Sequence, residues 1–403
     1  MKLKIPLLIY CFFNLTLIAD MQIEEIITTG SILNNPAENS SPLDIIDQDD
    51  LNDLNIITIG EISKYIASST GSQFQTNALD GTDQGMSSIT LRGLDHTSTL
   101  VLINSKRQTS AGTTSNEGEG YVDINIIPQI ALKQVHILKE GATTAYGSDA
   151  ISGVVNFLTQ DDFEGVKLNL NQQKTTNYNQ RDSSLGILFG KKYDNSNFVF
   201  AIDYIDRSPL NASEIPGIAE LGLSTLGNSF KVSADDVVDS GVYQGSYSEN
   251  QWVADPNCIN NGGILAGPFC KFLYGERFNI INTEEHIKSY LSYKFDAESY
   301  QSKTTLIYAD ISVKDNPQSP SYPALSFLSR KIQPGIGGSP FNVPVTWYGR
   351  PLGSAYPSPN SPKDISQYHL SHVINFDVNE ISDIEISITN SRHSNIHNRP
   401  DTI

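Results

Sequence analysis

From residue 165 to the end, the chain is dominated by short segments in which apolar and polar residues alternate. Val166, Leu168 and Leu170, for example, alternate with lysine and asparagine side chains. Alternation at period two puts the apolar side chains of a strand on one face, and such two-faced segments of about ten residues are typical of transmembrane β-strands. A soluble β-sandwich alternates in the same way, so the pattern leaves both folds open. Seven such segments occur, at 166–170, 185–189, 198–204, 287–295, 307–313, 368–378 and 384–388.

Two further features favour the membrane barrel over the sandwich. Aromatic side chains recur on or near the apolar faces, as the interfacial girdles of outer-membrane barrels require. The connections are also unequal, because 194–197 is a tight turn whereas 208–280 and 316–364 are long and rich in Pro, Gly, Ser and Asn. Seven antiparallel strands are too few to close, and bacterial barrels have even numbers. We therefore expect an incomplete barrel with long extracellular loops over 165–403, and a truncated chain.

The N-terminus predicts export from the cytoplasm. A short basic start, residues 1–4, precedes a mostly apolar run that ends at Ala19. This run is too short for a transmembrane helix, which needs about 20 residues, and it predicts a secretory signal peptide over residues 1–19. The net charge of −18 excludes broad binding of nucleic acid, which needs a basic face. It also argues against a polybasic protein that binds a membrane surface.

Two cysteines remain after removal of the predicted signal peptide, which carries Cys11. Cys258 and Cys270 lie in an insertion rich in Gly, Asn and Pro between two predicted strands. Export delivers this pair to an oxidising compartment, where disulfides form and persist. We therefore expect a disulfide between Cys258 and Cys270 in an extracellular loop, the alternative being two unpaired thiols.

Residues 43–160 mix helical and strand patterns, which indicates a small α+β domain ahead of the barrel strands. Thr58 is a plausible N-cap for a short helix that ends near Ile66, because apolar residues recur there at helical spacing. Pro128 precedes an expected single helical turn at 129–133. Short strands separated by glycine-rich turns are expected at 88–91, 99–103, 135–138 and 154–158.

Several short motifs follow one another in this domain. Leu-Arg-Gly-Leu at 91–94 precedes an apolar strand that ends in Asn104-Ser105, and two glycine-rich motifs occupy 135–142 and 146–157. Their order and spacing resemble the plug domain of TonB-dependent outer-membrane receptors, closely over the plug and only in style over the remaining chain. The residues that carry the resemblance are Arg92, Gly93, Gly141, Tyr146, Gly147, Gly153 and Asn156.

The resemblance implies an α+β plug domain followed by antiparallel transmembrane β-barrel strands, in the outer membrane of a Gram-negative bacterium and in contact with its lipid. Such a receptor binds a scarce ligand outside the cell and admits it when the TonB energy-coupling protein acts on the plug. The ligand stays open among a ferric siderophore, haem, a vitamin, a glycan and a peptide. Because plugged transporters have about 22 strands, seven would be only part of the barrel.

Three residues of the motif region carry more specific expectations. In the family, the arginine of this Arg-Gly pair is typically tied to the barrel wall, so Arg92 is expected there. For Arg107 a solvated surface charge is the simpler interpretation. Ser105 stands in a tight turn where the family usually has glycine, and we expect strain if its φ is positive.

The segment that follows the predicted signal peptide looks like a TonB box. A β-branched run on a flexible tether suits the addition of a strand to the energy-coupling protein, whereas an ordinary N-terminal tail is the alternative. The box belongs to a linker segment at 20–42 and comprises Ile23, Glu24, Glu25, Ile26, Ile27, Thr28, Thr29 and Gly30.

Motifs of catalytic chemistry are absent from the sequence, which contains no Walker loop, no Gly-x-Ser-x-Gly and no His-Glu-x-x-His. His369 and His372 fall on opposite faces of one strand, and His393 and His397 share a face but are too few to indicate a metal. We therefore expect no enzyme activity, metal or cofactor. The acidic residues at 117–119 resemble a plug-apex loop that contacts ligand. The alternative function is a secreted or outer-membrane β-rich adhesin or structural protein without energy coupling.

Overall fold

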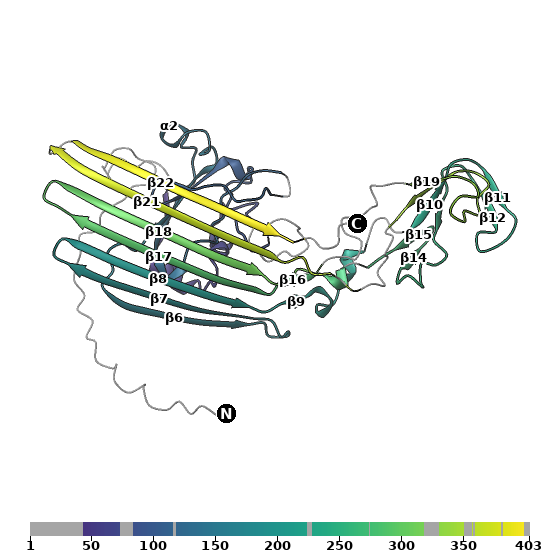
Figure 1. Cartoon of the computed structure of the whole chain (residues 1–403), viewed down its shortest axis with the longest axis horizontal. Helices are drawn as coiled ribbons and strands as arrows, with labels where there is room; N and C mark the ends of the chain where they lie inside the picture. Colours follow the sequence, from purple (N-terminus) through teal and green to yellow (C-terminus); the bar gives the residue numbers. More distant parts are fainter. Residues whose placement is uncertain are drawn as a thin grey trace, which may run out of the picture.

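The computed structural model describes residues 43–72, 84–115, 118–223, 228–273, 275–317, 330–349, 357, 359–379 and 382–398. It consists of a small mixed sheet, a sheet of long antiparallel strands that curves past it, and a β-rich lobe beyond one end of the long strands (Figure 1). Within the described residues, no helix has the length and apolar character needed to cross a membrane.

The mixed sheet is the core of the N-terminal domain, with strands in the order β1-β4-β5-β2-β3. β2 and β5 run parallel and the other neighbouring pairs are antiparallel. β4, β5 and β2 each have a neighbouring strand on both sides. The helix α1 (Gln48–Asp53) begins at Asp47, whose side chain accepts from the N–H groups of Asp49 and Asp50. The strands are β1 (Leu43–Ile46), β2 (Thr99–Ile103), β3 (Lys106–Arg107), β4 (Leu132–Leu138) and β5 (Gly153–Thr159).

Two local predictions in this domain need correction. The expected helix at 58–66 is a 3₁₀ helix, η2 (Ile59–Tyr65), and Thr58 precedes it without a side-chain cap. The expected strand at 88–91 does not form. Its backbone donors go to side chains instead, since Thr90 N–H donates to Ser72 Oγ at 2.8 Å and Leu91 N–H to Thr99 Oγ1 at 3.0 Å. The expected turn at 129–133 is present as η4 (Gln129–Ala131), and a short helix α2 (Thr143–Tyr146) follows β4.

The long strands form one seven-stranded sheet in the order β22-β21-β18-β17-β8-β7-β6, which confirms the seven strands expected from the alternation. Every neighbouring pair is antiparallel. β6 and β22 are the edges of this sheet in the described structure. The strands are β6 (Gly165–Lys174), β7 (Arg181–Tyr193), β8 (Ser196–Arg207), β17 (Glu284–Asp296), β18 (Tyr300–Val313), β21 (Lys363–Asn379) and β22 (Ser382–His397).

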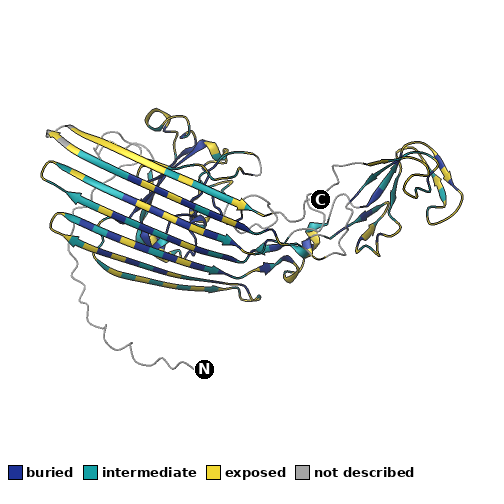
Figure 2. Ribbon diagram, in the orientation of Figure 1, coloured by how far each residue is buried: buried dark blue, intermediate teal, exposed yellow. Residues whose placement is uncertain are grey.

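Burial alternates along these strands, as their sequence requires. Val166, Leu170 and Ile388 expose 70%, 70% and 69% of their surface on the outer face. Ala201 and Ala309 are buried on the inner face, against the N-terminal domain. Figure 2 shows the alternation as bands of buried and exposed colour along each arrow. An apolar outer face and an inner face that carries another domain are the arrangement of a plugged membrane barrel.

The connections differ at the two ends of the sheet. A two-residue turn joins β7 to β8 and a three-residue turn joins β17 to β18, at one end. At the other end, the long connections 208–283 and 314–362 build a lobe of short strands (Figure 1). The lobe contains a sheet in the order β13-β10-β20-β19 and the hairpins β11–β12 and β14–β15. Its strands are β10 (Ser229–Val232), β11 (Asp236–Val238), β12 (Gly245–Tyr247), β13 (Trp252–Ala254), β14 (Ile264–Ala266), β15 (Phe269–Lys271), β19 (Arg330–Ile332) and β20 (Val345–Tyr348), and β9 (Leu210–Asn211) pairs with β16 (Asn279–Ile281) below it.

Candidate functional site

The N-terminal domain sits directly on the inner face of the seven-stranded sheet, which we call the wall. One buried apolar cluster runs across the boundary between them. Burying apolar surface from both sides stabilises the contact without any directional bond. The wall contributes Leu188, Val199, Ala201, Tyr290, Ile307 and Ala309, and the domain contributes Ile124, Ile126, Ile127 and Ile130.

Glycines let the two surfaces approach closely at two points. A Cβ at Gly186 of β7 would lie 2.6 Å from Asp203 Oδ1 and 3.1 Å from Ile130 Cδ1. A Cβ at Gly85 of the domain would lie 2.7 Å from Cδ1 of Ile365 on β21. Only a residue without a side chain fits this spacing, so the fit of domain and wall is specified from both sides.

Buried polar groups add directional contacts to this apolar fit. Lys288 of β17 donates from Nζ to Asn125 Oδ1 at 3.2 Å, and Asp203 Oδ2 of β8 accepts from Ile130 N–H at 3.3 Å. Lys288 and Asp203 face each other across the two strands, so the wall offers a cation and an anion side by side. Buried charges of this kind need such partners, because an unpaired one costs several kcal/mol.

Tyr290 of β17 makes a second polar contact at the end of β5. Its hydroxyl donates to Gln160 O at 2.7 Å and accepts from Thr159 Oγ1 at 2.9 Å. The side chain is fully buried. Tyr290 therefore binds the start of the connection between β5, the last strand of the domain, and β6, the first strand of the wall.

The junction itself is clamped by further wall residues. Lys303 of β18 forms an ion pair with Asp161, and Asn197 Nδ2 donates to Asp161 O at 3.0 Å and to Asp162 Oδ1 at 3.2 Å. Burial alone would raise the pKa of Asp161, but Lys303, Lys294 and Lys133 outweigh it and hold that pKa below its usual value. The junction carboxylate is thus charged and locked to the wall.

A buried arginine joins the wall to η2. The Arg207 side chain is only 3% exposed and lies among three carboxylates, at 3.1 Å from Asp182, 3.6 Å from Glu284 and 3.9 Å from Glu61. The first two belong to the wall, and Glu61 belongs to the domain. A buried guanidinium needs such compensation, so withdrawing Glu61 would weaken a charge network as well as a single contact.

The last wall strand contacts the loop after β3. His393 Nδ1 accepts from Gly112 N–H at 2.9 Å, and its Nε2 lies 3.4 Å from Asp123 Oδ2. Because Nδ1 accepts, the proton of a neutral imidazole sits on Nε2 and points to Asp123. Further along the same strand, Lys106 forms an ion pair with Glu385. The wall therefore holds the domain from strands at both ends of the described sheet.

In the part of the chain that the structure describes, the side chain of Arg92 donates its hydrogen bonds within the domain, so the expected tie to the barrel wall stays a prediction. Its Nε donates to Ser152 O at 3.0 Å and its Nη2 to Ile151 O at 2.6 Å, both within the domain. Arg92 has a φ of 60° and Gly93 a φ of 69°, so the side chain pins a left-handed bend to the segment before β5. The contact with the wall is made by other residues of the domain.

Asn156 closes the tight turn after β2. Asn104 and Ser105 have φ values of 49° and 61°, so Ser105 does adopt the left-handed conformation. Asn156 compensates, because its Oδ1 accepts from Ser105 N–H at 3.0 Å and its Nδ2 donates to Ser105 Oγ at 3.1 Å. Only glycine fits at position 153, since a Cβ there would lie 2.2 Å from Leu138 O.

The remaining motif residues surround α2 on the surface of the domain. Gly147 has a φ of 86°, and a Cβ at Gly141 would lie 3.1 Å from a backbone oxygen. Arg107 donates to the carbonyl oxygen of Tyr146 and pairs with Asp149, so this exposed arginine has partners. The hydrogen bond from Arg107 holds the pKa of Asp149 below its usual value.

Other expected features have different outcomes. The predicted signal peptide and the predicted TonB box lie outside the described residues, as does Glu117 of the expected apex loop. Glu119 accepts from His96 N–H at 3.1 Å, which is a contact within the domain. Among the described residues, no three His, Cys, Asp or Glu side chains gather closely enough to hold a metal ion.

Sequence reasoning did not identify the residues that join domain and wall. Asp203 and Lys288 were visible as polar residues at inward positions of their strands. The alternation marks that inner face, but it does not reveal which inward side chain meets which segment of the domain. Buried charge in a strand that otherwise faces lipid is the one signal that could have found them.

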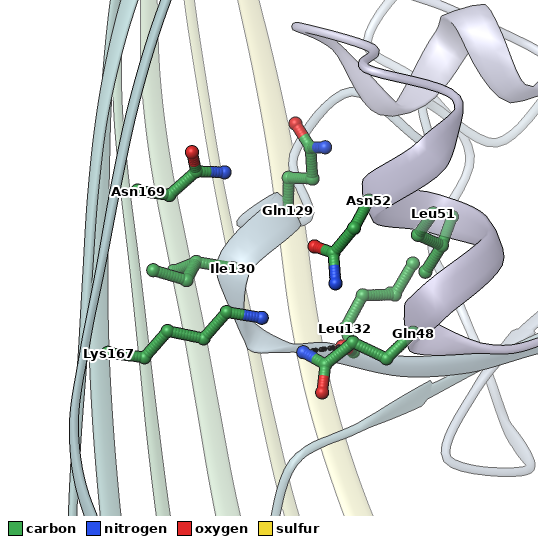
Figure 3. Close-up of a pocket in the computed structure, with 8 residues that line it drawn as sticks. All are labelled: Gln48, Leu51, Asn52, Gln129, Ile130, Leu132, Lys167 and Asn169. Carbon is green, nitrogen blue, oxygen red and sulfur yellow. Dashed lines mark hydrogen bonds between the residues drawn. The ribbon is translucent and has the colours of Figure 1, made fainter.

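A small cavity separates α1 and η4 from β6, the edge strand of the wall (Figure 3). Its volume is about 10 Å³, the space of a single water molecule. Figure 3 shows Lys167 of β6 and Gln48 of α1 on opposite sides of this space, with Gln48 donating to Leu132 O at 3.5 Å. The space is polar and small, which suits a solvated seam rather than a ligand site.

The lobe contains the two cysteines. Cys258 and Cys270 are joined by a disulfide and fully buried beside Phe272. A Cβ at Gly263 would lie 2.7 Å from one sulfur and 2.8 Å from the other, so the chain packs tightly around the bond. The disulfide fixes the hairpin β14–β15 to the preceding turn, as the sequence predicted for a long loop.

Comparison with known proteins identifies the domain and the fold. The family model of the TonB-dependent receptor plug domain matches residues 35–154. An iron-regulated outer membrane virulence protein of Vibrio cholerae serotype O1 is 39% identical over 75 residues, which are 18% of this chain and 12% of that protein. The crystal structure of a ferric enterobactin receptor mutant from Pseudomonas aeruginosa, in complex with enterobactin, matches with a TM-score of 0.52 at 12% identity. A second structure of a ferric enterobactin receptor, in complex with BCV-L6, matches with a TM-score of 0.50 at 12% identity.

Both structural matches cover 88% of this chain and 41% of the receptor. The chain therefore spans less than half the length of the solved receptors and about an eighth of the Vibrio protein that it matches. Over that span, a plug domain lies against antiparallel strands with an apolar outer face. Residues 35–154 therefore belong to the plug-domain family of TonB-dependent receptors, and the described residues of the chain have the fold of such a plug together with seven antiparallel strands of a β-barrel.

Proposed function

We propose that this chain belongs to a receptor that takes up a scarce ligand, a ferric siderophore first among the possibilities, across the outer membrane with energy from TonB. The observation that carries the proposal is the plug domain seated on the wall through buried polar contacts. The names of the relatives support the siderophore, since the Vibrio protein is iron-regulated and the solved receptors are ferric enterobactin receptors. Haem, a vitamin, a glycan and a peptide remain the alternatives to it.

The contacts between plug and wall explain why such a receptor needs energy to open. A plug held by Lys288, Tyr290, Arg207 and Lys303 blocks the space inside the wall until those contacts break. Each contact is a hydrogen bond or ion pair, so water can replace it once the segment moves. Force applied at the N-terminus can then open a path without any covalent step, and the family is one of receptors and transporters rather than enzymes.

The proposed division of labour follows the chain. A signal peptide at 1–19 directs export, and a linker at 20–42 carries the box that TonB grips. The plug at 43–160 closes the pore, and the strands and long loops of 165–403 contact lipid and ligand. The loops lie at the end opposite the tight turns, which is the extracellular end in an outer-membrane barrel.

The test separates ligand binding from uptake in the full-length receptor in its native outer membrane. Strand addition depends on main-chain hydrogen bonds, so Ile26→Pro should break the pairing with TonB, because proline removes a donor and fixes φ. Ile26→Ala keeps the donor and is the matched control. Binding should survive both changes, and uptake should be lost only with proline.

Equal uptake by the wild type and both variants would remove the box. If deletion of residues 23–30 also left uptake intact, a β-rich adhesin or structural protein without energy coupling would be the better description.

A further inference from the structure

The turn between β6 and β7 is short and closed by hydrogen bonds, unlike the two long connections at the same end of the wall. Thr175 N–H donates to Gln180 O at 3.1 Å, and the Thr175 hydroxyl lies 3.2 Å from the same oxygen. On the other side of β7, Arg181 N–H donates to Ser208 Oγ at 2.8 Å. β6 and β7 lie along one edge of the wall (Figure 1), and their outer end is a well-fixed hairpin rather than a long loop.

The outer face of this hairpin changes from apolar to basic toward that end. Three pairs of outward side chains lie opposite one another across the two strands. From the middle of the wall toward its outer end they are Leu170–Leu185, Gln172–Ser183 and Lys174–Arg181. The apolar and the basic pair are four residues apart, which is about 13 Å along the strand. Because barrel strands tilt by about 40°, the difference in height across the membrane is about 10 Å.

A shallow hollow of about 400 Å³ lies on this outer face, immediately inward of the basic pair. Leu170 and Leu185 line it together with Tyr204 of β8, which lies opposite Leu185. Gln172 and the small Ser183 line the side nearer the basic pair. The three large side chains are 70%, 37% and 36% exposed, so the hollow opens toward the lipid that surrounds such a wall.

The basic pair beside the hollow is not compensated. Lys174 and Arg181 are both exposed, and like charges directly opposite one another destabilise a sheet. Within the part of the chain that the structure describes, neither forms an ion pair, and the outward carboxylate of Asp206 on β8 reaches neither. By contrast, Lys314 on the same face and at the same end of the wall is paired with Glu285. A bound anion would remove the repulsion between the two cations.

We propose that the outer face of the β6–β7 hairpin binds a phosphorylated lipid of the surrounding leaflet, with Lys174 and Arg181 pairing with its phosphate groups. One acyl chain of this lipid then fills the hollow. Charge complementarity selects the head group, because arginine takes phosphate bidentately and lysine adds a second positive charge. The apolar hollow about 10 Å deeper selects a lipid over free phosphate, since only a molecule with an anionic head and an apolar chain contacts both.

The inference goes beyond the proposed uptake and requires only that the outer face of the wall meets lipid. It gives the receptor a fixed lipid contact on the first strand after the plug.

Native mass spectrometry of the full-length receptor in detergent measures the binding of single lipid molecules. The probes are diphosphorylated lipid A, the same lipid with both phosphates removed, and inorganic phosphate. We expect saturable binding of the diphosphorylated lipid and at least tenfold weaker binding of the dephosphorylated one. Inorganic phosphate should not displace the lipid, because it lacks the acyl chain. Equal binding of both lipids would mean apolar contact alone, and displacement by inorganic phosphate would mean a free anion site. Either result would overturn the proposal.

Substitutions then locate the site. Lys174→Gln and Arg181→Gln should each weaken binding of the diphosphorylated lipid about threefold or more, as expected for exposed ion pairs. Leu185→Ser should weaken it by a similar factor through the lost apolar contact. Lys314→Gln is the matched control and should leave binding unchanged, because Glu285 already neutralises that lysine. An equal loss with Lys314→Gln would mean a general charge effect and would overturn the proposal. Lipid binding is measured without transport, so its failure is distinct from failure of the proposed uptake.

Discussion

Replacing Tyr290 by phenylalanine should loosen the plug at its junction with the barrel. The change removes one buried hydroxyl that donates to Gln160 O at 2.7 Å and accepts from Thr159 Oγ1 at 2.9 Å, while the ring stays in the apolar cluster. Each lost hydrogen bond costs about 0.5–1.5 kcal/mol, so the seated plug should lose about 1–3 kcal/mol. The population of plugs open at this junction should then rise about 5- to 150-fold.

Hydrogen exchange measured by mass spectrometry on the detergent-solubilised receptor can detect this opening. Amides of 153–162 should exchange faster in Tyr290→Phe by that factor, when exchange is limited by the opening equilibrium. Tyr293→Phe is the matched control, because Tyr293 lies on the same strand but is 43% exposed on the outer face. If the two variants exchanged at the same rate, the hydroxyl would not hold the junction, and the seat would rest on apolar packing alone.

Three further outcomes follow from the structure. Gly186→Ala places a methyl group 2.6 Å from Asp203 Oδ1, so plug seating should weaken by about 1–3 kcal/mol, seen as faster exchange across the plug. Changing Cys258 and Cys270 together to serine should destabilise the lobe by about 3 kcal/mol, seen as faster proteolysis of 208–283 with the barrel intact. Burial lowers the pKa of His136 from 6.5, so the unfolded plug binds a proton more readily than the folded one. Plug stability to urea should therefore fall as the pH drops below about 6.5, and His136→Gln should flatten that dependence.

The barrel strands were predictable because their physical requirement is local. A strand between lipid and a packed interior must alternate, and segments such as 198–204 and 287–295 do so over their whole length. The 88–91 segment failed for the opposite reason. Its apolar residues suit a strand, but its backbone N–H groups donate to the side chains of Ser72 and Thr99, which are 18 and 8 residues away in the chain. No local pattern reports such tertiary partners.

The residues that join the plug to the wall were much less predictable than the fold. Family motifs drew attention to Arg92 and Gly147, which turned out to shape the plug internally. The contacts between plug and wall come from Lys288, Tyr290 and Arg207 of the wall, whose partners in the plug lie more than a hundred residues away in sequence. Which inward residue meets the plug depends on how two domains dock, and a single sequence does not encode that in any short pattern.

The folded lobe formed by the two long loops was not predicted from the sequence. Their Pro, Gly, Ser and Asn content indicated irregular connections, yet they form a four-stranded sheet with its own aromatic core. Strands of three or four residues are too short to show alternation. Their pairing across two loops, as between β10 and β20, is equally invisible in sequence. The disulfide was the one feature of the lobe that composition and compartment could anticipate.

Locking the plug to the wall tests most directly whether the plug must move for uptake. Lys106 of the plug and Glu385 of β22 form an ion pair, so cysteines at these two positions can be joined by a short bis-maleimide in the full-length receptor. We expect the cross-linked receptor still to bind its ligand but no longer to take it up, while the unlinked double variant does both. Uptake by the cross-linked receptor at the unlinked rate would show that the plug need not leave the wall, because the ligand would then pass a plug that stays attached to it.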